Sequence, residues 1–385
     1  MNIKLMNNIY IYGFWASLFF ERTIWLNYLK HNNYSIVQIG FLQTILTLVM
    51  FISELPSGVL TDKFGAKKVM YVGHLFISLY LLMMLFNINI GFLMFGFMSY
   101  GIGLALISGS DQTLLHQHNP KQTYQSKIGK YTAYSIIGMT LSSIFGGYLT
   151  TISWSSIFIL GIFTQIISIF ILVGIKISKE NKNKINKTIT ISCLFDNLKE
   201  VLKKKNIRYL LITIAIFQGI MSVLLNFTQL LLANKSFSPF GSSIVISLGL
   251  LSAIISSFSI ERISKKMGRN TAIRWFLLLL SSGFLLLSFS NFTLIVLSLL
   301  IIRFSFEFVD TSLNIVIQEL SNDKIRTTLI SGVNTLTALI MFVGTSIITI
   351  LFSIFNVSFV FVILGVVLVL FTSLFYLLFL KNHTT

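Results

Sequence analysis

Charged side chains are scarce in this sequence. They make up 11% of its 385 residues, whereas a soluble domain carries about 25%, so a soluble globular class is excluded. Proline is also rare, with 3 residues, while 55% of the chain is hydrophobic, Phe accounts for 36 residues and the mean hydropathy is +0.84. Because the long apolar runs do not alternate with polar residues, they predict membrane-spanning helices rather than a barrel. The predicted fold class is an all-α polytopic membrane protein.

Groups that carry catalytic or metal chemistry are scarce as well. Cys193 is the only cysteine, which excludes an intramolecular disulfide and gives no sign of a metal cluster. The sequence has no phosphate-cradling glycine loop with its lysine, so ATP-driven transport is not supported. It also lacks membrane-embedded histidines and acids at a catalytic spacing. We therefore expect no enzymatic activity, no cofactor and no metal.

Apolar segments long enough to span a bilayer follow one another along the chain. The first begins after a single early lysine and lacks a small-residue cleavage site, so it is interpreted as a span and not as a signal peptide. Twelve spans are expected, near 8–30, 35–57, 69–87, 91–116, 128–150, 153–175, 207–233, 240–260, 271–289, 291–318, 326–351 and 356–380.

The basic residues gather on one side of these spans. An even number of spans puts both termini on the same side, and that side carries Lys63, Lys67, Lys68, Lys121, Lys127, Lys130, Arg262, Lys265, Lys266, Arg269 and Arg274. The opposite loops hold little more than Lys30 and Lys235. The positive-inside rule then predicts a multi-pass cell-membrane protein with both termini in the cytoplasm. The net charge of +17 is thus explained without a nucleic-acid partner, and the Asn, Ile and Lys bias points to a bacterial source.

The only long polar stretch, 176–206, divides the chain into two halves, 1–175 and 207–385. Within it, Leu194, Leu198, Val201 and Leu202 recur at helical spacing between lysines. This pattern predicts an amphipathic helix on the inner membrane face, with a solvated linker as the alternative. The halves also show weak internal similarity. The segment from Glu261 to Asn270 resembles residues 58–68. In this comparison Gly268 corresponds to Gly65, a little over two hundred residues earlier.

That earlier run, residues 58–68, is the sharpest motif of the chain. Its pattern is glycine, three residues, acid, base, any residue, glycine, any residue, base, base, and all six positions are filled, by Gly58, Asp62, Lys63, Gly65, Lys67 and Lys68. The run resembles the signature loop of the major facilitator superfamily. Glu54, Pro56 and Ser57 extend the resemblance to bacterial drug-efflux-type members. What the resemblance implies is a transporter with two pseudo-symmetric six-helix bundles, alternating access and a cytoplasmic gate formed by this loop.

The chemistry of the loop residues suggests individual roles. We expect Gly58 to let neighbouring backbones approach and Gly65 to permit a tight turn. Asp62 can accept from amides at a helix N-terminus, and Lys67 and Lys68 can anchor to anionic headgroups or pair with acids between the halves. The alternative is a tight turn with lysines that set the topology and have no gating role.

Ionisable residues at membrane depth are costly and are therefore functional candidates. The tenth predicted span carries a polar stripe at helical spacing, composed of Arg303, Glu307, Asp310, Asn314 and Gln318. The resemblance places the first, fourth, seventh and tenth spans around a central cavity. Those spans hold this stripe together with Glu21, Arg22, Asp111, Gln218, Ser222, Asn226 and Gln229. Glu21, Glu307 and Asp310 are candidates for carrying a coupling proton. The alternatives are static pairs of Arg303 with Glu307 and of Glu21 with Arg22, and a packing role for Asp111.

Two departures from the family pattern concern direction of transport. Proton-coupled exporters often carry an arginine in the fourth span, but residues 97–105 contain no arginine. They also often carry a glycine–proline signature in the fifth span, and the corresponding segment here, residues 138–147, contains no proline. His116 and His118 flank a helix end and are interpreted as solvated rather than metal-binding.

Taken together, the sequence predicts a monomeric secondary transporter that exports amphiphilic small molecules in exchange for protons. Its expected partners are the small-molecule substrate, protons and the lipid bilayer. An importer of a nutrient or metabolite on the same fold is the first alternative. A non-transporting membrane sensor or assembly partner is an alternative from another class.

Overall fold

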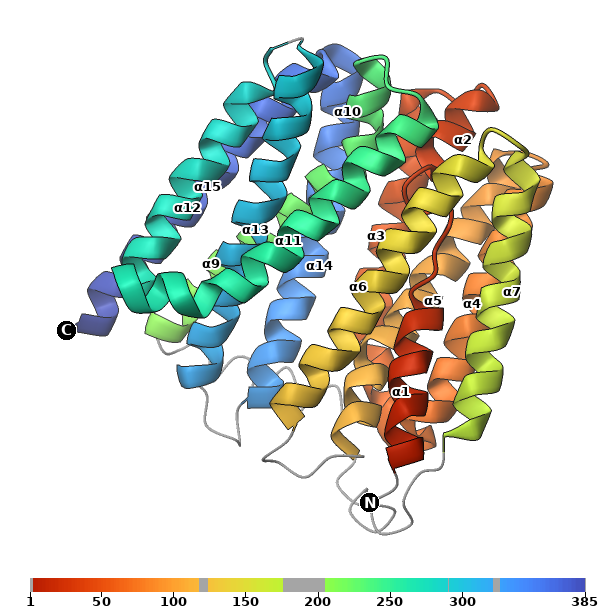
Figure 1. Cartoon of the computed structure of the whole chain (residues 1–385), viewed down its shortest axis with the longest axis horizontal. Helices are drawn as coiled ribbons and strands as arrows, with labels where there is room; N and C mark the ends of the chain where they lie inside the picture. The colour runs from red at the N-terminus through yellow and green to blue at the C-terminus, as the bar shows by residue number, and fades with distance from the viewer. Residues whose placement is uncertain (1–2, 118–123, 176–204, 290, 321–325, 385) are drawn as a thin grey trace. The chain divides into compact units, whose positions relative to one another are not determined.

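The computed structural model describes residues 3–117, 124–175, 205–289, 291–320 and 326–384. Within these ranges the regular structure is entirely helical (Figure 1). The predicted amphipathic helix at Leu194, Leu198, Val201 and Leu202 lies outside the described residues, as do Cys193 and His118.

The chain separates into two compact units, Met1–Tyr34 with Phe41–Ile191, and Ser35–Gly40 with Ser192–Thr385. The helices up to the linker are α1 (Ile3–Ala16), α2 (Trp25–His31), α3 (Ile36–Phe64), α4 (Ala66–Phe86), α5 (Ile90–Gln117), α6 (Tyr124–Leu149) and α7 (Trp154–Gly174). In the first unit, α4 packs against α5 and α7, and α1 packs against α6 and α7.

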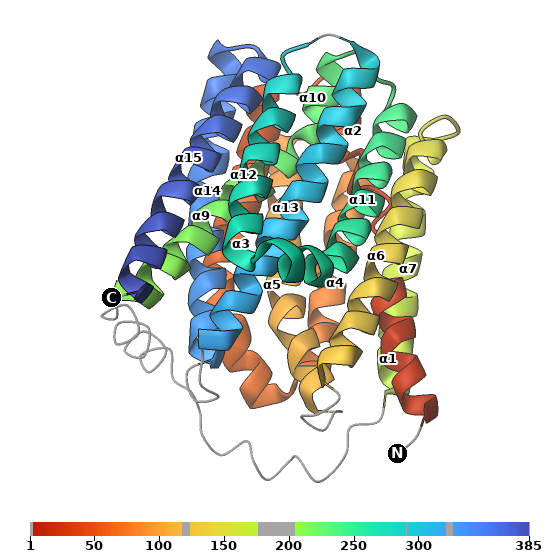
Figure 2. The same ribbon diagram turned by 60° about the vertical axis from the view of Figure 1, so that its left-hand side comes forward.

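The remaining helices are α9 (Lys205–Asn226), α10 (Thr228–Asn234), α11 (Pro239–Met267), α12 (Arg269–Leu286), α13 (Phe292–Leu320), α14 (Arg326–Ile354) and α15 (Val357–Thr384). Here α9 packs against α14 and α15, while α13 packs against α11 and α12, which Figure 2 shows from a second direction. Apolar side chains fill these contacts; Phe276, for example, stacks on Phe308 with ring centroids 3.9 Å apart.

The helices follow the predicted spans closely. Nine of the described helices are long and apolar enough to cross a membrane. The expected spans at 8–30, 128–150 and 271–289 overlap with α1 and α2, with α6 and with α12, and these helices are not among the nine. The chain is thus an all-α protein with many membrane-spanning helices, as its lack of charge predicted.

The two halves repeat the same backbone pattern. Gly65 precedes α4 with φ 87° and ψ 141°, and Gly268 precedes α12 with φ 79° and ψ 137°. Such positive φ values suit glycine, which has no Cβ to clash. The separation, 268 − 65 = 203 residues, recurs between Asn33 and Ser236, which have φ values of 64° and 63°. The weak sequence repeat therefore corresponds to a structural repeat in register.

Candidate functional site

A polar network joins three helices of the second unit at membrane depth. Asp310 lies on α13, and the side-chain amide of Gln218 on α9 donates to its Oδ1 at 2.7 Å. The amide of Asn314, one turn further along α13, donates to its Oδ2 at 3.1 Å. Thr337 on α14 in turn donates to Gln218 Oε1 at 3.3 Å. The predicted polar stripe of α13 thus meets the predicted polar face of α9.

The charge of Asp310 is held by neutral donors only. Each carboxylate oxygen accepts from a side-chain amide, and among the described residues Asp310 forms no ion pair. Glu307, another acid, is an electrostatic neighbour on the same helix. An ionised carboxylate within a membrane is costly, and a positive charge bound beside it would lower that cost.

Glu307 is bound differently from the static pair that the sequence allowed. Its Oε1 accepts from Ser257 on α11 and from Thr311, each at 3.2 Å, and no ion pair with Arg303 occurs in the described part of the chain. The stem of Arg303 runs along α11, where a Cβ at Gly249 would lie 3.1 Å from its Cγ. A four-residue spacing permits such a pair but does not make the two side chains turn toward each other.

In the first unit, the first predicted span is interrupted. α1 ends at Ala16 and α2 begins at Trp25, and Glu21 lies in the break with 1% of its surface exposed. Neither of its carboxylate oxygens has a hydrogen-bond partner in the described structure. Arg22 instead lies 6.0 Å from the ring of Phe19 and within 4.0 Å of Met139 Sδ. The Glu21–Arg22 ion pair is therefore not formed.

Two tyrosines are electrostatic neighbours of Glu21. Its carboxylate interacts electrostatically with Tyr80 and Tyr100, whose rings stack at 4.2 Å and 4°. Gly146 on α6 lies against the segment that carries Glu21, because a Cβ there would lie 2.0 Å from the carbonyl oxygen of Phe20. Interrupted membrane helices supply binding groups in many transporters, and here the break supplies a desolvated acid.

The other predicted cavity residues lie on α5, α9 and α10. Asp111 on α5 accepts from the hydroxyl of Tyr131 on α6 at 3.4 Å through its Oδ2. Asn226 is the last residue of α9, and Gln229 is buried at the start of α10. The side chain of Gln318, at the end of the stripe, is not among those described.

The predicted gate motif forms the connection from α3 to α4. Gly65 makes the expected turn, and Lys67 donates to the carbonyl oxygens of Val173 at 3.0 Å and Ile175 at 2.9 Å. Lys67 thus caps the C-terminal end of α7, where a positive charge is favourable. The sequence predicted lipid headgroups or acids as its partners.

Other motif residues are less constrained in this structure. Contrary to expectation, a Cβ at Gly58 would meet no described atom within 4 Å, so its lack of a side chain does not serve a close approach here. Lys63 lies 5.4 Å from the ring of Phe64 and Lys68 is exposed. Glu54 is partly buried on α3. The side chain of Asp62 is not among those that the structure describes.

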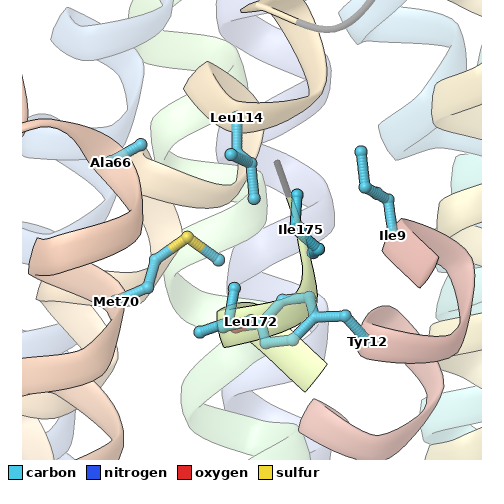
Figure 3. Packing of buried hydrophobic residues seen from close by; sticks show 7 residues of the cluster. All are labelled: Ile9, Tyr12, Ala66, Met70, Leu114, Leu172 and Ile175. Atoms are coloured by element: carbon cyan, nitrogen blue, oxygen red, sulfur yellow. The ribbon is translucent and has the colours of Figure 1, made fainter. Parts of the chain in front are cut away.

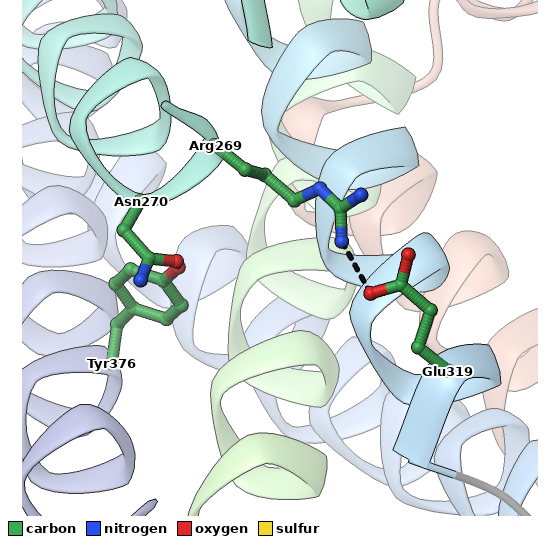
Figure 4. A network of polar contacts seen from close by, with 4 residues as sticks. All are labelled: Arg269, Asn270, Glu319 and Tyr376. Atoms are coloured by element: carbon green, nitrogen blue, oxygen red, sulfur yellow. Dashed lines mark hydrogen bonds and ion pairs between the residues drawn. The ribbon is translucent and has the colours of Figure 1, made fainter. Parts of the chain in front are cut away.

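The second unit carries a corresponding connection, from α11 to α12. Arg269 bonds to Glu319 at the end of α13 at 2.5 Å, and Asn270 accepts from the hydroxyl of Tyr376 on α15 at 2.8 Å (Figure 4). Asn270 occupies the repeat position of Lys67. Both therefore tie a helix start to the last helix of their own unit. Sequence reasoning missed Glu319 and Tyr376, although the degenerate motif at 261–270 marked the place.

Comparisons with known proteins agree with this architecture. A family model described as Major Facilitator Superfamily matches residues 9–345 and 237–385. The chain is 26% identical over 254 residues to the uncharacterized MFS-type transporter YxaM of Bacillus subtilis, covering 64% of this chain and 63% of that protein. It is 29% identical over 117 residues to the MFS-type transporter MJ1317 of Methanocaldococcus jannaschii, covering 30% of this chain and 29% of the relative.

Solved structures share the fold at low sequence identity. A POT family transporter in complex with 5-aminolevulinic acid has a TM-score of 0.80 at 14% identity, over 98% of this chain and 96% of that one. The nucleoside transporter NupG has a TM-score of 0.74 at 14% identity, over 98% and 99%. The inward-open xylose transporter XylE of E. coli has a TM-score of 0.73 at 14% identity, over 96% of each chain. With the family model spanning nearly the whole sequence, these helices and their repeated connections identify the chain as a member of the Major Facilitator Superfamily.

Proposed function

We propose that this chain is a secondary active transporter that exports amphiphilic small molecules in exchange for protons, with Asp310 as a coupling group. The observation that carries the proposal is the hydrogen bonding of Asp310. Gln218 and Asn314 donate to this carboxylate at membrane depth, and it forms no ion pair among the described residues. Binding of a proton would remove its costly charge and would change these two hydrogen bonds.

The response follows from the donors and acceptors of the site. Ionised Asp310 accepts from both amides, whereas a protonated carboxyl must donate from one oxygen. The NH₂ group facing that oxygen then meets a weaker, neutral acceptor, and the amide gains a stronger bond if it turns so that its own carbonyl oxygen accepts from the new O–H. If Gln218 turns, its bond from Thr337 is lost as well. Proton loading therefore changes the contacts among α9, α13 and α14.

The size of this response suits a transport cycle. Hydrogen bonds between membrane helices contribute about 0.6 kcal/mol on average and up to about 1.7 kcal/mol. Losing one or two of them shifts a conformational equilibrium by roughly threefold to more than tenfold, without disrupting the packed helices. This is the scale expected of a group that biases two states of one fold.

The substrate class and the direction of transport rest on broader features. A chain with few charges and many aromatic residues suits an apolar or weakly cationic ligand, and the motif at Glu54, Pro56 and Ser57 resembles drug-efflux members. Import remains the second candidate, since the structural neighbours include proteins named for nucleosides and xylose. A membrane sensor would need neither proton movement nor substrate movement.

Inside-out vesicles from cells that express the chain test this proposal. A proton gradient is imposed, a panel of amphiphilic compounds is added and a pH-sensitive dye is followed. We expect compound-dependent collapse of the gradient with the wild type and with Glu261→Gln, a control that neutralises an acid with an 80% exposed side chain. The response is expected to be absent with Asp310→Asn.

Two outcomes contradict the proposal in different ways. An equal response from Asp310→Asn removes this residue from the coupling step. No response to any compound, together with compound uptake in right-side-out vesicles, shows an importer.

A further inference from the structure

Glu21 is a buried acid without a hydrogen-bond partner. It has 1% of its surface exposed, and neither carboxyl oxygen is bonded to any group that the structure describes. Its own backbone N–H and the guanidinium of Arg22 are near enough to influence the carboxyl group, but neither is a hydrogen-bond partner of it. Glu21 differs in this from Asp310, whose two carboxyl oxygens each accept from a side-chain amide.

The backbone around Glu21 is well bonded, although its side chain is not. The carbonyl oxygen of Glu21 accepts from the N–H groups of Ile24 at 2.9 Å and of Trp25 at 2.7 Å, so that this residue leads into the first turn of α2. Before it, the carbonyl oxygen of Leu18 accepts from the hydroxyl of Thr164 on α7 at 3.3 Å. The break between α1 and α2 is thus an ordered turn that keeps the carboxyl group inside the unit.

The helices on both sides of the break are anchored in apolar contacts. α1 belongs to a buried cluster, shown in Figure 3, that comprises Ile9, Tyr12, Ala66, Met70, Leu114, Leu172 and Ile175. After the break, Trp25, Leu26 and Leu29 of α2 are buried as well. Because these anchors hold both ends, water reaches Glu21 only if the segment between the two helices moves.

Few charged or titratable groups face this carboxyl group. Arg22 follows it in the sequence and forms no ion pair with it, and Tyr80 on α4 and Tyr100 on α5 interact with it electrostatically. The sequence of α7 contains no titratable residue, and neither do residues 138–147 of α6. No described group therefore neutralises an ionised Glu21 by direct contact.

An ionised carboxylate in these surroundings is unfavourable. A charge within a membrane is costly, and desolvation disfavours the charged form of an acid. Donors that would favour the charged form are missing around Glu21 among the described residues. A bound proton removes the charge and leaves a neutral carboxyl group, which costs far less to bury. By the same reasoning, the two amide donors of Asp310 help that acid to ionise.

We propose that Glu21 is a proton-binding site of the first unit, that it carries a proton in this conformation, and that it keeps this proton to a higher pH than Asp310. The step is the reversible addition of a proton from water to one carboxylate oxygen, and no other bond forms or breaks. Movement of the segment between α1 and α2 admits water and permits release. The comparison with Asp310 rests on the proposed function, whereas the protonation of Glu21 does not.

Infrared spectroscopy of the full chain in lipid nanodiscs tests this proposal. A protonated carboxyl group has a carbonyl stretch apart from the bands of ionised carboxylates, and this stretch lies at higher frequency when the group accepts and donates no hydrogen bond. We expect such a band at about pH 6, where an exposed glutamate with a pKa of about 4.3 is ionised. Cell-free synthesis with glutamate that carries ¹³C in its side-chain carboxyl group should shift the band, which assigns it to glutamate without any substitution.

Variants then assign the band to one residue. Glu21→Gln, which has the shape of the neutral acid, should remove it. Glu261→Gln, which neutralises an exposed acid, should leave it unchanged. Glu307 accepts from two hydroxyls, so a protonated Glu307 would absorb at lower frequency. Absence of a protonated glutamate band at about pH 6, or a band that persists in Glu21→Gln, overturns the proposal.

A pH titration compares the two acids. Labelled aspartate and Asp310→Asn identify the band of Asp310 in the same way. We expect the glutamate band to disappear at a pH at least about one unit above that at which the aspartate band disappears, as for an acid that lacks hydrogen-bond donors. Loss of the glutamate band at the same or a lower pH contradicts the proposal. If no protonated aspartate is found at any pH while the Glu21 band is present, the coupling role of Asp310 fails and the Glu21 site stands.

Discussion

Substitution of Gly146 by alanine tests the packing around the interrupted first span. A Cβ at this position would lie 2.0 Å from the carbonyl oxygen of Phe20, whereas ordinary contact begins near 3.4 Å. The obstacle is backbone in the segment that carries Glu21 and cannot rotate away as a side chain tip would. Either α6 or the segment between α1 and α2 must therefore move by more than an ångström.

The expected cost is that of overpacking a core, about 1–3 kcal/mol. For a unit of this size, each kcal/mol lowers the melting temperature by about 2–4 °C, so Gly146→Ala should melt on the order of 5 °C below the wild type. The measurement is thermal unfolding of the purified protein in detergent, followed by intrinsic fluorescence. The control is Gly174→Ala, since a Cβ there meets only Asn8 Nδ2 at 3.8 Å.

The comparison has a clear negative result. If Gly146→Ala and Gly174→Ala both melt within about 1 °C of the wild type, the close approach of α6 to the helix break does not limit stability. The close packing inferred between Gly146 and the segment that carries Glu21 would then be wrong.

Three further substitutions test the gate motif and the polar stripe. Asp62→Asn should slow transport severalfold while membrane insertion and expression, measured by immunoblot, stay near the wild-type level; an equal loss of protein would support a purely structural turn. Glu307→Gln should change the pH profile of vesicle transport if this acid exchanges protons, and an unchanged profile with active transport would rule out a proton role there. Lys67→Met removes the cap on α7, which should cost about 1 kcal/mol of stability and lower the melting temperature by a few degrees. Lys68→Met, at an exposed position, should leave the melting temperature unchanged. Equal melting temperatures of the two variants would refute the capping role.

Much of the fold follows from the sequence because the membrane imposes it. Backbone groups in lipid must bond within their own segment, so apolar length alone predicts where helices lie. The turn at Gly65 and its repeat at Gly268 were also predictable, since the motif fixes glycine where φ is positive. The break between Ala16 and Trp25 was not predicted, because residues 17–24 contain no proline or glycine that would mark a helix end. The charges of Glu21 and Arg22 were instead interpreted as cavity-facing groups of one continuous span.

The contacts of the candidate site were less accessible to sequence reasoning. Periodicity revealed that α13 has a polar stripe, but the partner of Asp310 is Gln218, which lies 92 residues away. The same limit applies to Lys67, whose acceptors are backbone carbonyls without a sequence signature. Spacing also suggested a pair of Arg303 with Glu307, whereas the acid is bound by the hydroxyls of Ser257 and Thr311. Side-chain direction depends on the neighbouring helix, which a single sequence does not specify.

The central claim is that Asp310 couples substrate movement to proton movement, and separating exchange from coupled transport tests it most directly. Purified protein in proteoliposomes is given a compound identified in the vesicle screen. Substrate exchange at equal pH is then compared with net transport driven by a proton gradient. The account predicts that Asp310→Asn keeps exchange and loses gradient-driven transport, while Glu261→Gln keeps both. Gradient-driven transport by Asp310→Asn at the wild-type rate would contradict it.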